Sequence, residues 1–257
     1  MVRIAGILNI TPDSFYSGAR YGDADAIRTA ALRMKAEGAG MIDVGACSTR
    51  PGSTPVSGQE ETSRLSYGMP VISEACPSMP LSVDTFRPSV AEFCIRNWHI
   101  AYINDVSGGC GEMYRIAGES HTGYILTYNQ PVSDHDNVVV EMTEFFADRL
   151  EKLQKAGVGD IILDPGFGFA KDMDQNYLVL AGLDRLKRFG LPVMAGLSRK
   201  SMACRLLGIT PEESLEATVS LNTLALAGGA DWLRVHDVRA AVQTATITEK
   251  YMNAIRD

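Results

Sequence analysis

Six short apolar runs in this chain each end at a polar residue that is capable of chemistry. The residues that close these runs are Asn9, Asp43, Asp84, Asn104, Asp164 and His236, and the last run also carries Arg234. Carboxylates and amides that converge on one place can accept hydrogen bonds from the N–H-rich edge of a flat heterocycle such as an aminopyrimidinone. Alternatively, they would be metal ligands or simple caps of loops. Their repetition at equivalent positions favours a binding site over isolated caps.

The apolar runs have the pattern of parallel strands that alternate with helices. Eight strands are predicted, at 4–8, 41–44, 81–83, 100–103, 124–126, 161–163, 193–197 and 232–235. Helices are predicted after each of them, at 23–37, 57–75, 86–97, 112–119, 136–156, 175–189, 211–227 and 238–255. This order predicts an α/β chain that forms a single (β/α)8 TIM barrel over residues 1–257, with its active site at the C-terminal ends of the strands.

An open, doubly wound sheet is the alternative fold. Such sheets usually carry G-x-G-x-x-G between the first strand and the first helix, whereas here Thr11-Pro-Asp-Ser-Phe15 follows the first strand. The length of 257 residues is close to the roughly 250 that are typical of one TIM barrel. The barrel is therefore the preferred prediction.

Composition and charge exclude several classes of function. The net charge of −7 gives no global basic field for nucleic acid, so an anionic substrate needs a local basic cluster. The five cysteines lack C-x-x-C spacing, which favours reduced thiols over a disulfide framework or a zinc site. No signal peptide or long apolar run is present. We expect a cytoplasmic protein that binds neither membranes nor nucleic acid.

Three loops and one strand end add groups that suit an anionic or aromatic ligand. Ser48-Thr49-Arg50 offers two hydroxyls and a planar fork for phosphate oxygens, or else a capped turn with a solvated arginine. Two glycines in 164–171 allow close approach of the backbone to a ligand. Residues 198–201 open a helix with two cations, which suits an anion, unless they form a solvated basic turn. Asn9 can offer an amide oxygen to Mg²⁺.

Together these strings resemble the dihydropteroate synthase family, the pterin-binding barrel enzymes of folate synthesis. The resemblance runs from about Ile4 to Val242 in the order of the family. The matching strings are GILNITPDSF, STRPG, SVDT, INDVSGG, DPGFGF, SRKS and RVHD. The family joins 6-hydroxymethyl-7,8-dihydropterin pyrophosphate to p-aminobenzoate and releases pyrophosphate. The resemblance implies this transferase reaction, with Mg²⁺ as cofactor and a homodimer as the assembly.

The resemblance also implies roles for individual residues. The pterin is assigned to Asp84, Asn104, Asp164 and Lys200, of which Asp84, Asp164 and Lys200 are the catalytic candidates. The pyrophosphate is assigned to Asn9, Asp43, Arg50, Arg234 and His236, with the metal at Asn9. The p-aminobenzoate pocket is assigned to Phe15, Thr49, Pro51, Phe169 and Ser201.

Three segments depart from the family pattern. Gly45-Ala-Cys-Ser48 replaces the usual Gly-Gly-Glu-Ser, and Leu126-Thr-Tyr-Asn-Gln-Pro131 replaces the usual His-Met-x-Gly, so that Tyr128 is expected to stack on the pterin in place of a methionine. Ala170 stands where a glycine is usual, which matters only if its φ is positive. These departures keep open a non-catalytic or regulatory pterin-binding paralogue. A folate-dependent corrinoid methyltransferase is less favoured, because the cations at 198–201 and 234–236 suit a pyrophosphate.

Overall fold

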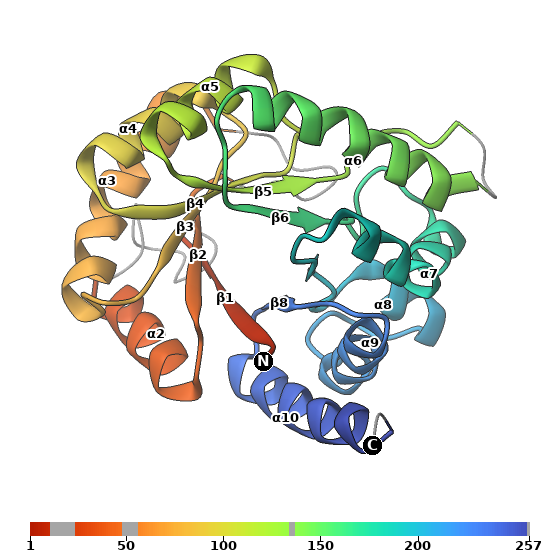
Figure 1. Cartoon of the computed structure of the whole chain (residues 1–257). Helices are drawn as coiled ribbons and strands as arrows, with labels where there is room; N and C mark the ends of the chain where they lie inside the picture. The colour runs from red at the N-terminus through yellow and green to blue at the C-terminus, as the bar shows by residue number, and fades with distance from the viewer. Residues whose placement is uncertain (11–23, 48–55, 134–136, 256–257) are drawn as a thin grey trace.

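The fold is an eight-stranded parallel sheet that is almost closed into a barrel (Figure 1). The computed structural model describes residues 1–10, 24–47, 56–133 and 137–255. Its strands are β1 (Arg3–Asn9), β2 (Met41–Gly45), β3 (Leu81–Asp84), β4 (Ile100–Asp105), β5 (Gly123–Thr127), β6 (Ile161–Asp164), β7 (Met194–Ala195) and β8 (Trp232–Val235). They pair in the order β6-β5-β4-β3-β2-β1-β8-β7, and a parallel bridge between Leu163 and Val193 joins the two edges. The predicted TIM-barrel architecture is confirmed.

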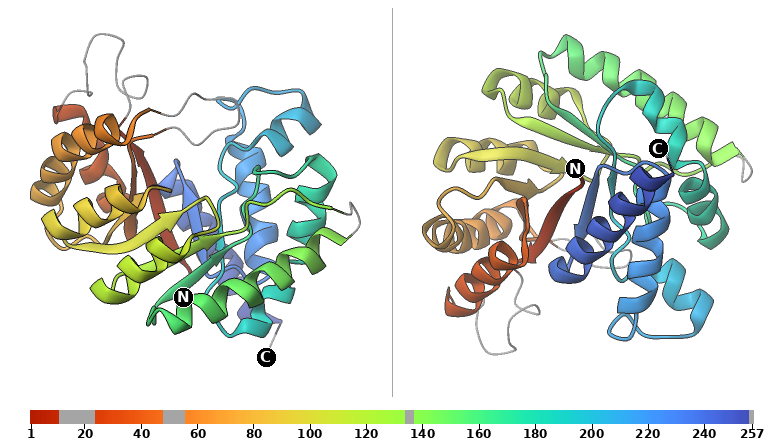
Figure 2. Two further views of the ribbon diagram at one scale, coloured as in Figure 1. Left: turned by 90° about the horizontal axis from the view of Figure 1, so that it is seen from above. Right: turned by 60° about the horizontal axis from the view of Figure 1, so that its bottom comes forward.

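Helices surround the sheet on its outer side (Figures 1 and 2). They are α2 (Ala24–Glu37), α3 (Gly58–Ala75), α4 (Pro88–Asn97), α5 (Gly111–Ser120), α6 (Val138–Lys155), α7 (Met173–Ala181), the 3-10 helix η2 (Leu183–Phe189), α8 (Ser201–Leu207), α9 (Leu215–Ala227) and α10 (Val238–Ala254). The N-terminus lies beside α10, where the Met1 amino group is 3.6 Å from Glu249 Oε1. No helix in the described ranges is both long enough and apolar enough to cross a membrane.

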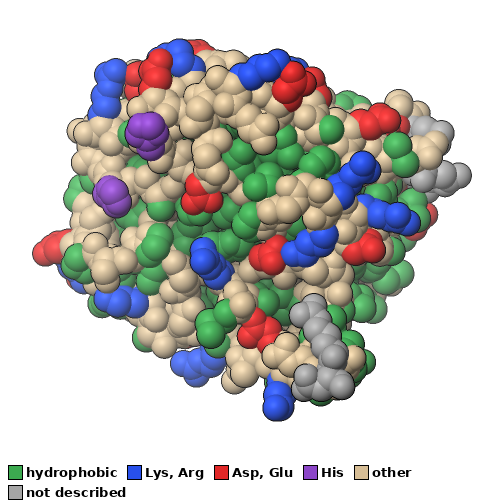
Figure 3. All heavy atoms as spheres, in the orientation of Figure 1, with side chains coloured by type: hydrophobic (Ala, Val, Ile, Leu, Met, Phe, Trp, Pro, Cys, Tyr) green, Lys and Arg blue, Asp and Glu red, His purple; other side chains and the backbone are tan. Residues whose placement is uncertain are grey.

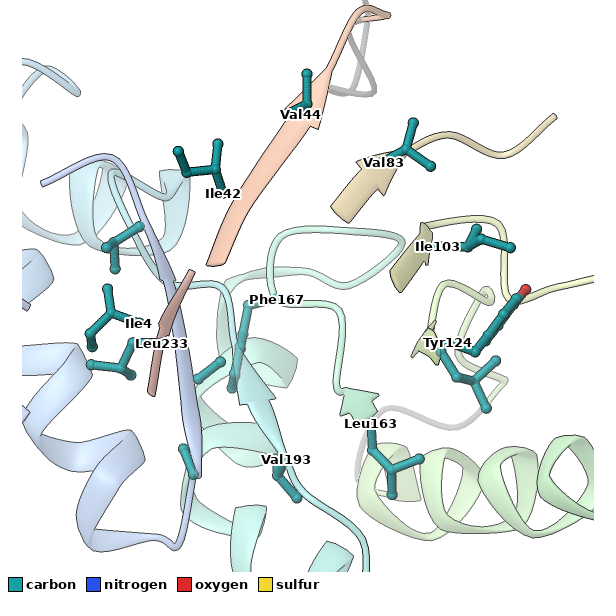
Figure 4. Packing of buried hydrophobic residues seen from close by; sticks show 14 of the residues in the cluster. Ile4, Ile42, Val44, Val83, Ile103, Tyr124, Leu163, Phe167, Val193 and Leu233 are labelled. Atoms are coloured by element: carbon teal, nitrogen blue, oxygen red, sulfur yellow. The ribbon is translucent and has the colours of Figure 1, made fainter. Parts of the chain in front are cut away.

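Alternation along the strands divides the core into two parts. Side chains that point outward, including Val44, Val83 and Ile103, pack beneath the helices (Figure 4). Side chains that point inward form a smaller apolar cluster, made of Ala5, Met41, Ile125, Ile162, Met194 and Trp232. Because successive strand residues face opposite sides, every second residue beyond this inner cluster points into the C-terminal mouth of the barrel.

Two predicted helices have different bounds in the structure. Helix 211–227 was expected to start at Pro211, but α9 starts at Leu215. Glu213 instead accepts hydrogen bonds from the N–H and hydroxyl of Thr210, which closes a local turn before the helix. The predicted helix 175–189 is α7 followed by η2, with Gly182 between them, and α7 begins earlier because Asp172 caps it.

The seventh strand is shorter than predicted. It spans two residues instead of 193–197 and pairs with β8 only at Met194 and Ala195. The other strands and helices agree with their predicted positions to within a few residues. The Ser57 hydroxyl caps α3 by accepting from the Glu60 N–H.

Charge is mixed on the face of the molecule shown in Figure 3. Lys and Arg side chains alternate there with Asp and Glu side chains, and no continuous basic patch appears on that face. Four of the cysteines are buried and Cys110 is exposed, and none of the five forms a disulfide.

Candidate active site

A layer of polar side chains lies directly above the inner apolar cluster. Asp43, Asp164 and Arg234 each follow, two positions later, a residue of that cluster on the same strand. Asp84 pairs in register with Gly45 on one side and with Asn104 on the other. The apolar cluster closes the barrel from below, and Asp43, Asp84, Asn104 and Asp164 above it are all buried.

Arg234 joins two of the carboxylates. Its Nε donates to Asp43 Oδ2 at 2.6 Å, and its terminal nitrogen donates to Asp84 Oδ2 at 2.7 Å. Asn104 Nδ2 donates to the same Asp43 oxygen at 2.9 Å. Residues from four strands therefore form one connected network, in which a single guanidinium compensates two buried negative charges.

Three oxygens of this network have no hydrogen-bond partner among the described residues. They are Asp43 Oδ1, Asp84 Oδ1 and Asn104 Oδ1. Leaving a buried acceptor unpaired costs about 1–3 kcal/mol, and more when the group is charged. Such a cost is expected where a ligand supplies the donors, so the mouth suits a compound rich in N–H groups.

Burial also changes the acidity of the carboxyl groups. It raises the pKa of Asp84 to about 7, with Arg234 opposing this shift and the nearby Asp43 charge adding to it. Burial likewise raises the pKa of Asp164 above its usual range, against a hydrogen bond from the Gly166 N–H. Desolvation disfavours the charged form of a carboxyl group, so both residues gain from a ligand that donates to them.

The loop after β6 brings an aromatic ring and a cation to the mouth. Asp164 Oδ1 accepts from Gly166 N–H at 2.7 Å, which folds the loop back over the strand end. Lys200 Nζ lies 4.7 Å from the centre of the Phe169 ring. A Cβ on Gly168 would come within 3.1 Å of the Lys200 side chain. The absence of a side chain at 168, where φ is +80°, lets Lys200 pass beside Phe169.

Residues 198–201, which follow β7, do not all take part in the anion site that the sequence predicted. Ser198 Oγ lies 3.0 Å from His236 Nδ1 and also accepts from the His236 N–H, so the ends of β7 and β8 are joined. Arg199 was expected to act with Lys200 on an anion. That expectation is wrong, because Arg199 makes two 3.0 Å hydrogen bonds to Asp237 and donates to two carbonyls of the 211–212 turn. Lys200 precedes α8, and Ser201 begins it and is exposed.

Tyr128 does not face the mouth, contrary to the expectation that it stacks on a pterin. Its ring is buried in the outer core, 5.2 Å from the centre of the Phe145 ring on α6. Lys171, which ends the 164–171 string and was assigned no role from the sequence, donates to the Tyr128 carbonyl and lies 4.7 Å from its ring centre. Burial lowers the pKa of Lys171 to about 8. The alternation of β5 was the signal that placed Tyr128 outside.

Cys47, one of the residues that depart from the family pattern, lies in an ionic cluster behind β2. Arg87 makes an ion pair with Glu61, whose side chain is fully buried, and donates to the Val56 carbonyl at 2.6 Å. The Cys47 side chain also hydrogen-bonds to Arg87. A thiol therefore occupies a place beside a guanidinium where the family usually has a carboxylate, and Glu61 supplies the negative charge instead.

Ala170 has a positive φ of 41°, the conformation in which a glycine is favoured. A side chain in the left-handed region costs roughly 1 kcal/mol, and glycine removes that cost at some expense in chain entropy. We expect Ala170→Gly to raise the free energy of unfolding by about 0.5 kcal/mol, measured by urea denaturation. Ala156→Gly, at a right-handed position, is the matched control and should lower it; a loss of stability in both variants would contradict the argument.

Five predicted site residues remain, and the structure describes only Asn9 among them. Phe15, Thr49, Arg50 and Pro51 lie outside the described residues. Asn9 closes β1, and its Oδ1 lies 3.0 Å from the place of a Cβ on residue 45, a close approach that a glycine there accommodates. Within the described ranges no group of three or more His, Cys, Asp or Glu side chains could hold a metal.

Comparisons with known proteins agree with this geometry. The family model for pterin-binding enzymes matches residues 5–236. Dihydropteroate synthase of Bacillus subtilis is 36% identical over 256 residues, which cover 97% of this chain and 88% of that protein.

Solved structures match over nearly the same length. The dihydropteroate synthase from Clostridium difficile, determined in the presence of pteroic acid, has a TM-score of 0.89 at 35% identity and covers 97% of this chain and 96% of its own. The Xanthomonas albilineans enzyme with 4-aminobenzoic acid has a TM-score of 0.88 at 37% identity, covering 98% and 93%. The chain therefore belongs to the dihydropteroate synthase family of pterin-binding enzymes.

Proposed function

We propose that the barrel mouth joins 6-hydroxymethyl-7,8-dihydropterin pyrophosphate to p-aminobenzoate, giving 7,8-dihydropteroate and pyrophosphate. As a dihydropteroate synthase the chain is a transferase of folate biosynthesis. The observation that carries the proposal is the pair of buried, unpaired oxygens on Asp84 and Asn104. A pterin presents N–H donors along one edge, which such acceptors bind in a bidentate fashion.

The pterin end of the site is assigned to Asp84, Asn104, Asp164 and Lys200. The two carboxylates would accept from the aminopyrimidinone edge, and their negative charge would stabilise positive charge that develops on the ring. Lys200, held beside Phe169, would contact the face or rim of the heterocycle. These are the groups through which the protein would orient the reacting methylene.

The pyrophosphate end is assigned to Asn9, Asp43, Arg50, Arg234 and His236. Arg234 lies between Asp43 and Asp84, so it connects the two ends of the site. The amide oxygen of Asn9 fits Mg²⁺, which prefers oxygen ligands and keeps several waters and substrate phosphates. When bound, the ion would neutralise charge on the departing pyrophosphate.

Departure of pyrophosphate can precede attack by the amine. The methylene left behind is a cation delocalised into the pterin, so a neutral aromatic amine is a sufficient nucleophile and no strong base is required. Phe15, Thr49, Pro51, Phe169 and Ser201 are assigned to the p-aminobenzoate pocket, with its carboxylate near the start of α8. Exclusion of water matters here, because water would capture the cation.

The first test is pyrophosphate release by the purified protein, given the pterin pyrophosphate and Mg²⁺, with and without p-aminobenzoate. Release that requires the amine and yields dihydropteroate supports the proposal. The departures at Cys47 and 127–130 motivate a second candidate, a pterin-binding paralogue without turnover. Pterin binding by a folded protein that releases no pyrophosphate would favour that candidate, and reversion of these residues would be the next step.

Pterin affinity should depend on pH through Asp84. Its raised pKa leaves the carboxyl protonated in acid, and a protonated carboxyl must lose its proton to accept two N–H groups. Affinity for 6-hydroxymethylpterin should therefore rise about 10–30-fold from about pH 5.5 to about pH 7.5 and then level off. Fluorescence titration at constant ionic strength measures it. Asp84→Asn should bind weakly without this slope; an equal slope in the variant would assign the titration to another group.

Association into a homodimer, a cytoplasmic location and the lack of nucleic-acid and membrane partners stay predictions. Leu224 on α9 and Ile247 and Tyr251 on α10 are exposed apolar side chains, and α9 packs beside α10. An interface on these helices would cover them. Sedimentation of the wild type and of Leu224→Asp would test this: a monomeric wild type contradicts the dimer.

A further inference from the structure

Thr127 is the last residue of β5, and its position turns it into the mouth. It stands two residues after Ile125, which belongs to the inner apolar cluster, so alternation directs both side chains inward. In the sheet it pairs in register with Asp164 of β6, a residue assigned to the pterin. Neighbouring side chains of parallel strands that pair in register lie on the same face, so Thr127 stands beside Asp164.

The Thr127 hydroxyl is buried and has no partner. The residue is 1% exposed, and its Oγ1 makes no hydrogen bond among the described residues. Thr244 on α10, by contrast, is also buried but donates to the Ala240 carbonyl at 2.8 Å. Valine has nearly the same shape without the unpaired hydroxyl, so packing alone gives no reason for threonine at 127.

The methyl group of Thr127 lies close to the loop after β6. Its methyl carbon Cγ2 lies 3.1 Å from where a Cβ on Gly166 would stand, so the methyl group is held against the loop after β6. The hydroxyl occupies a different staggered position on the same Cβ.

Thr127 differs in hydrogen-bonding character from the other strand-end residues that have an unpaired atom, Asp43, Asp84 and Asn104. The unpaired atoms of Asp43, Asp84 and Asn104 are all acceptors, and ionised carboxylates can only accept. A hydroxyl can also donate. The N–H edge of a pterin is flanked by two acceptors, the 4-carbonyl oxygen and the ring nitrogen N1, which carboxylates cannot bind.

We propose that the Thr127 hydroxyl donates a hydrogen bond to one of the pterin acceptors that flank the edge read by Asp164, which makes Thr127 a specificity-determining residue of this chain. The inference rests on the proposed function, since it takes the ligand of the mouth to be a pterin. The segment 126–131 departs from the family pattern, and Tyr128 was the residue expected to contact the pterin there. Under this proposal Thr127 makes that contact instead.

Two substitutions separate the hydroxyl from the shape of the side chain. Thr127→Val keeps the shape and removes the donor, and Thr127→Ser keeps the donor and removes the methyl group. Thr244→Val is the matched control, because it removes a buried threonine hydroxyl far from the mouth. The probe is 6-hydroxymethylpterin, titrated by its fluorescence, and steady-state kinetics give the KM of each substrate separately.

We expect Thr127→Val to bind the pterin about tenfold more weakly, as for one lost hydrogen bond, and Thr127→Ser to stay within about threefold of the wild type. The KM for the pterin pyrophosphate should rise in the valine variant while the KM for p-aminobenzoate and the melting temperature stay unchanged. A purely structural role would change stability and both KM values together. Thr244→Val should leave both KM values unchanged.

Pterin affinity of folded Thr127→Val within twofold of the wild type would overturn the proposal. If the valine variant does not fold, Thr127→Ala is judged by the same criterion. A wild-type protein that neither binds the pterin nor makes dihydropteroate would instead refute the proposed function. An active wild type with an unaffected valine variant would refute only the role of Thr127.

Discussion

Replacement of Asp84 by asparagine should cause the largest loss of activity among substitutions that preserve the fold. The carboxylate is buried in the network with Arg234 and has one oxygen without a partner. Asparagine puts an amide N–H where the pterin also donates, so at least one charged hydrogen bond is lost and one repulsive contact appears. We expect kcat/KM for the pterin pyrophosphate to fall roughly 100- to 1,000-fold, about 3–4 kcal/mol, as measured in initial-rate assays.

The fold should survive this change. Burial already disfavours the charged form of Asp84, so a neutral side chain of similar shape fits the site. Asp160→Asn is the matched control, because Asp160 precedes β6 at the opposite end of the barrel and accepts from the Tyr102 hydroxyl. It should keep activity within about twofold. Activity of Asp84→Asn within twofold of the wild type would remove Asp84 from the pterin site.

Replacement of Arg234 by alanine should affect stability and pyrophosphate recognition together. The guanidinium compensates Asp43 and Asp84, both nearly inaccessible. Breaking a buried ion pair by removing one partner costs about 3–5 kcal/mol, so the free energy of unfolding should fall by about that amount in urea denaturation. Product inhibition by pyrophosphate should weaken by about tenfold or more, since a charged hydrogen bond to phosphate is lost.

Two further variants make the Arg234 result specific. Arg234→Lys keeps the charge but lacks the planar fork that reaches both carboxylates, so it should recover part of the stability and is the variant to assay if alanine prevents folding. Arg239→Ala removes an exposed arginine of the adjacent helix and should change neither property. Unchanged pyrophosphate inhibition in a folded Arg234 variant would contradict the assignment to the pyrophosphate.

The barrel and the polar strand ends were predictable because both follow from local periodicity. Apolar runs such as 41–44 and 161–163 alternate with amphipathic segments at short intervals, and parallel strands connected in this way place all their C-terminal ends on one side. Asp84, Asn104 and Asp164 could therefore be assigned to one site before their contacts were known. The sequence motifs of the family, which occur here in the same order, then indicated the reaction.

The partners of the charged residues were not predictable in the same way. Arg199 and Lys200 are adjacent cations in one string, yet Arg199 is bound by Asp237 and by the carbonyls of the 211–212 turn, whereas Lys200 lies beside Phe169. The same carbonyls belong to the turn that delays the start of α9. The wrong role for Arg199 and the wrong start of α9 have the same cause. Both depend on contacts between separate segments of the chain, and the local pattern of the sequence does not predict such contacts.

The sequence by itself determined the strand order of this barrel, the polar residues at its mouth and its family, because hydrophobic alternation and motif order are local properties. Only the tertiary structure decided which of those charged residues form ion pairs with each other. Arg234 neutralises both Asp43 and Asp84, and the pKa of Asp84 rises, since burial makes each unpaired charge costly. It also decided that Thr127, not Tyr128, points into the barrel, because the register and closure of the barrel determine which side of a strand is inside.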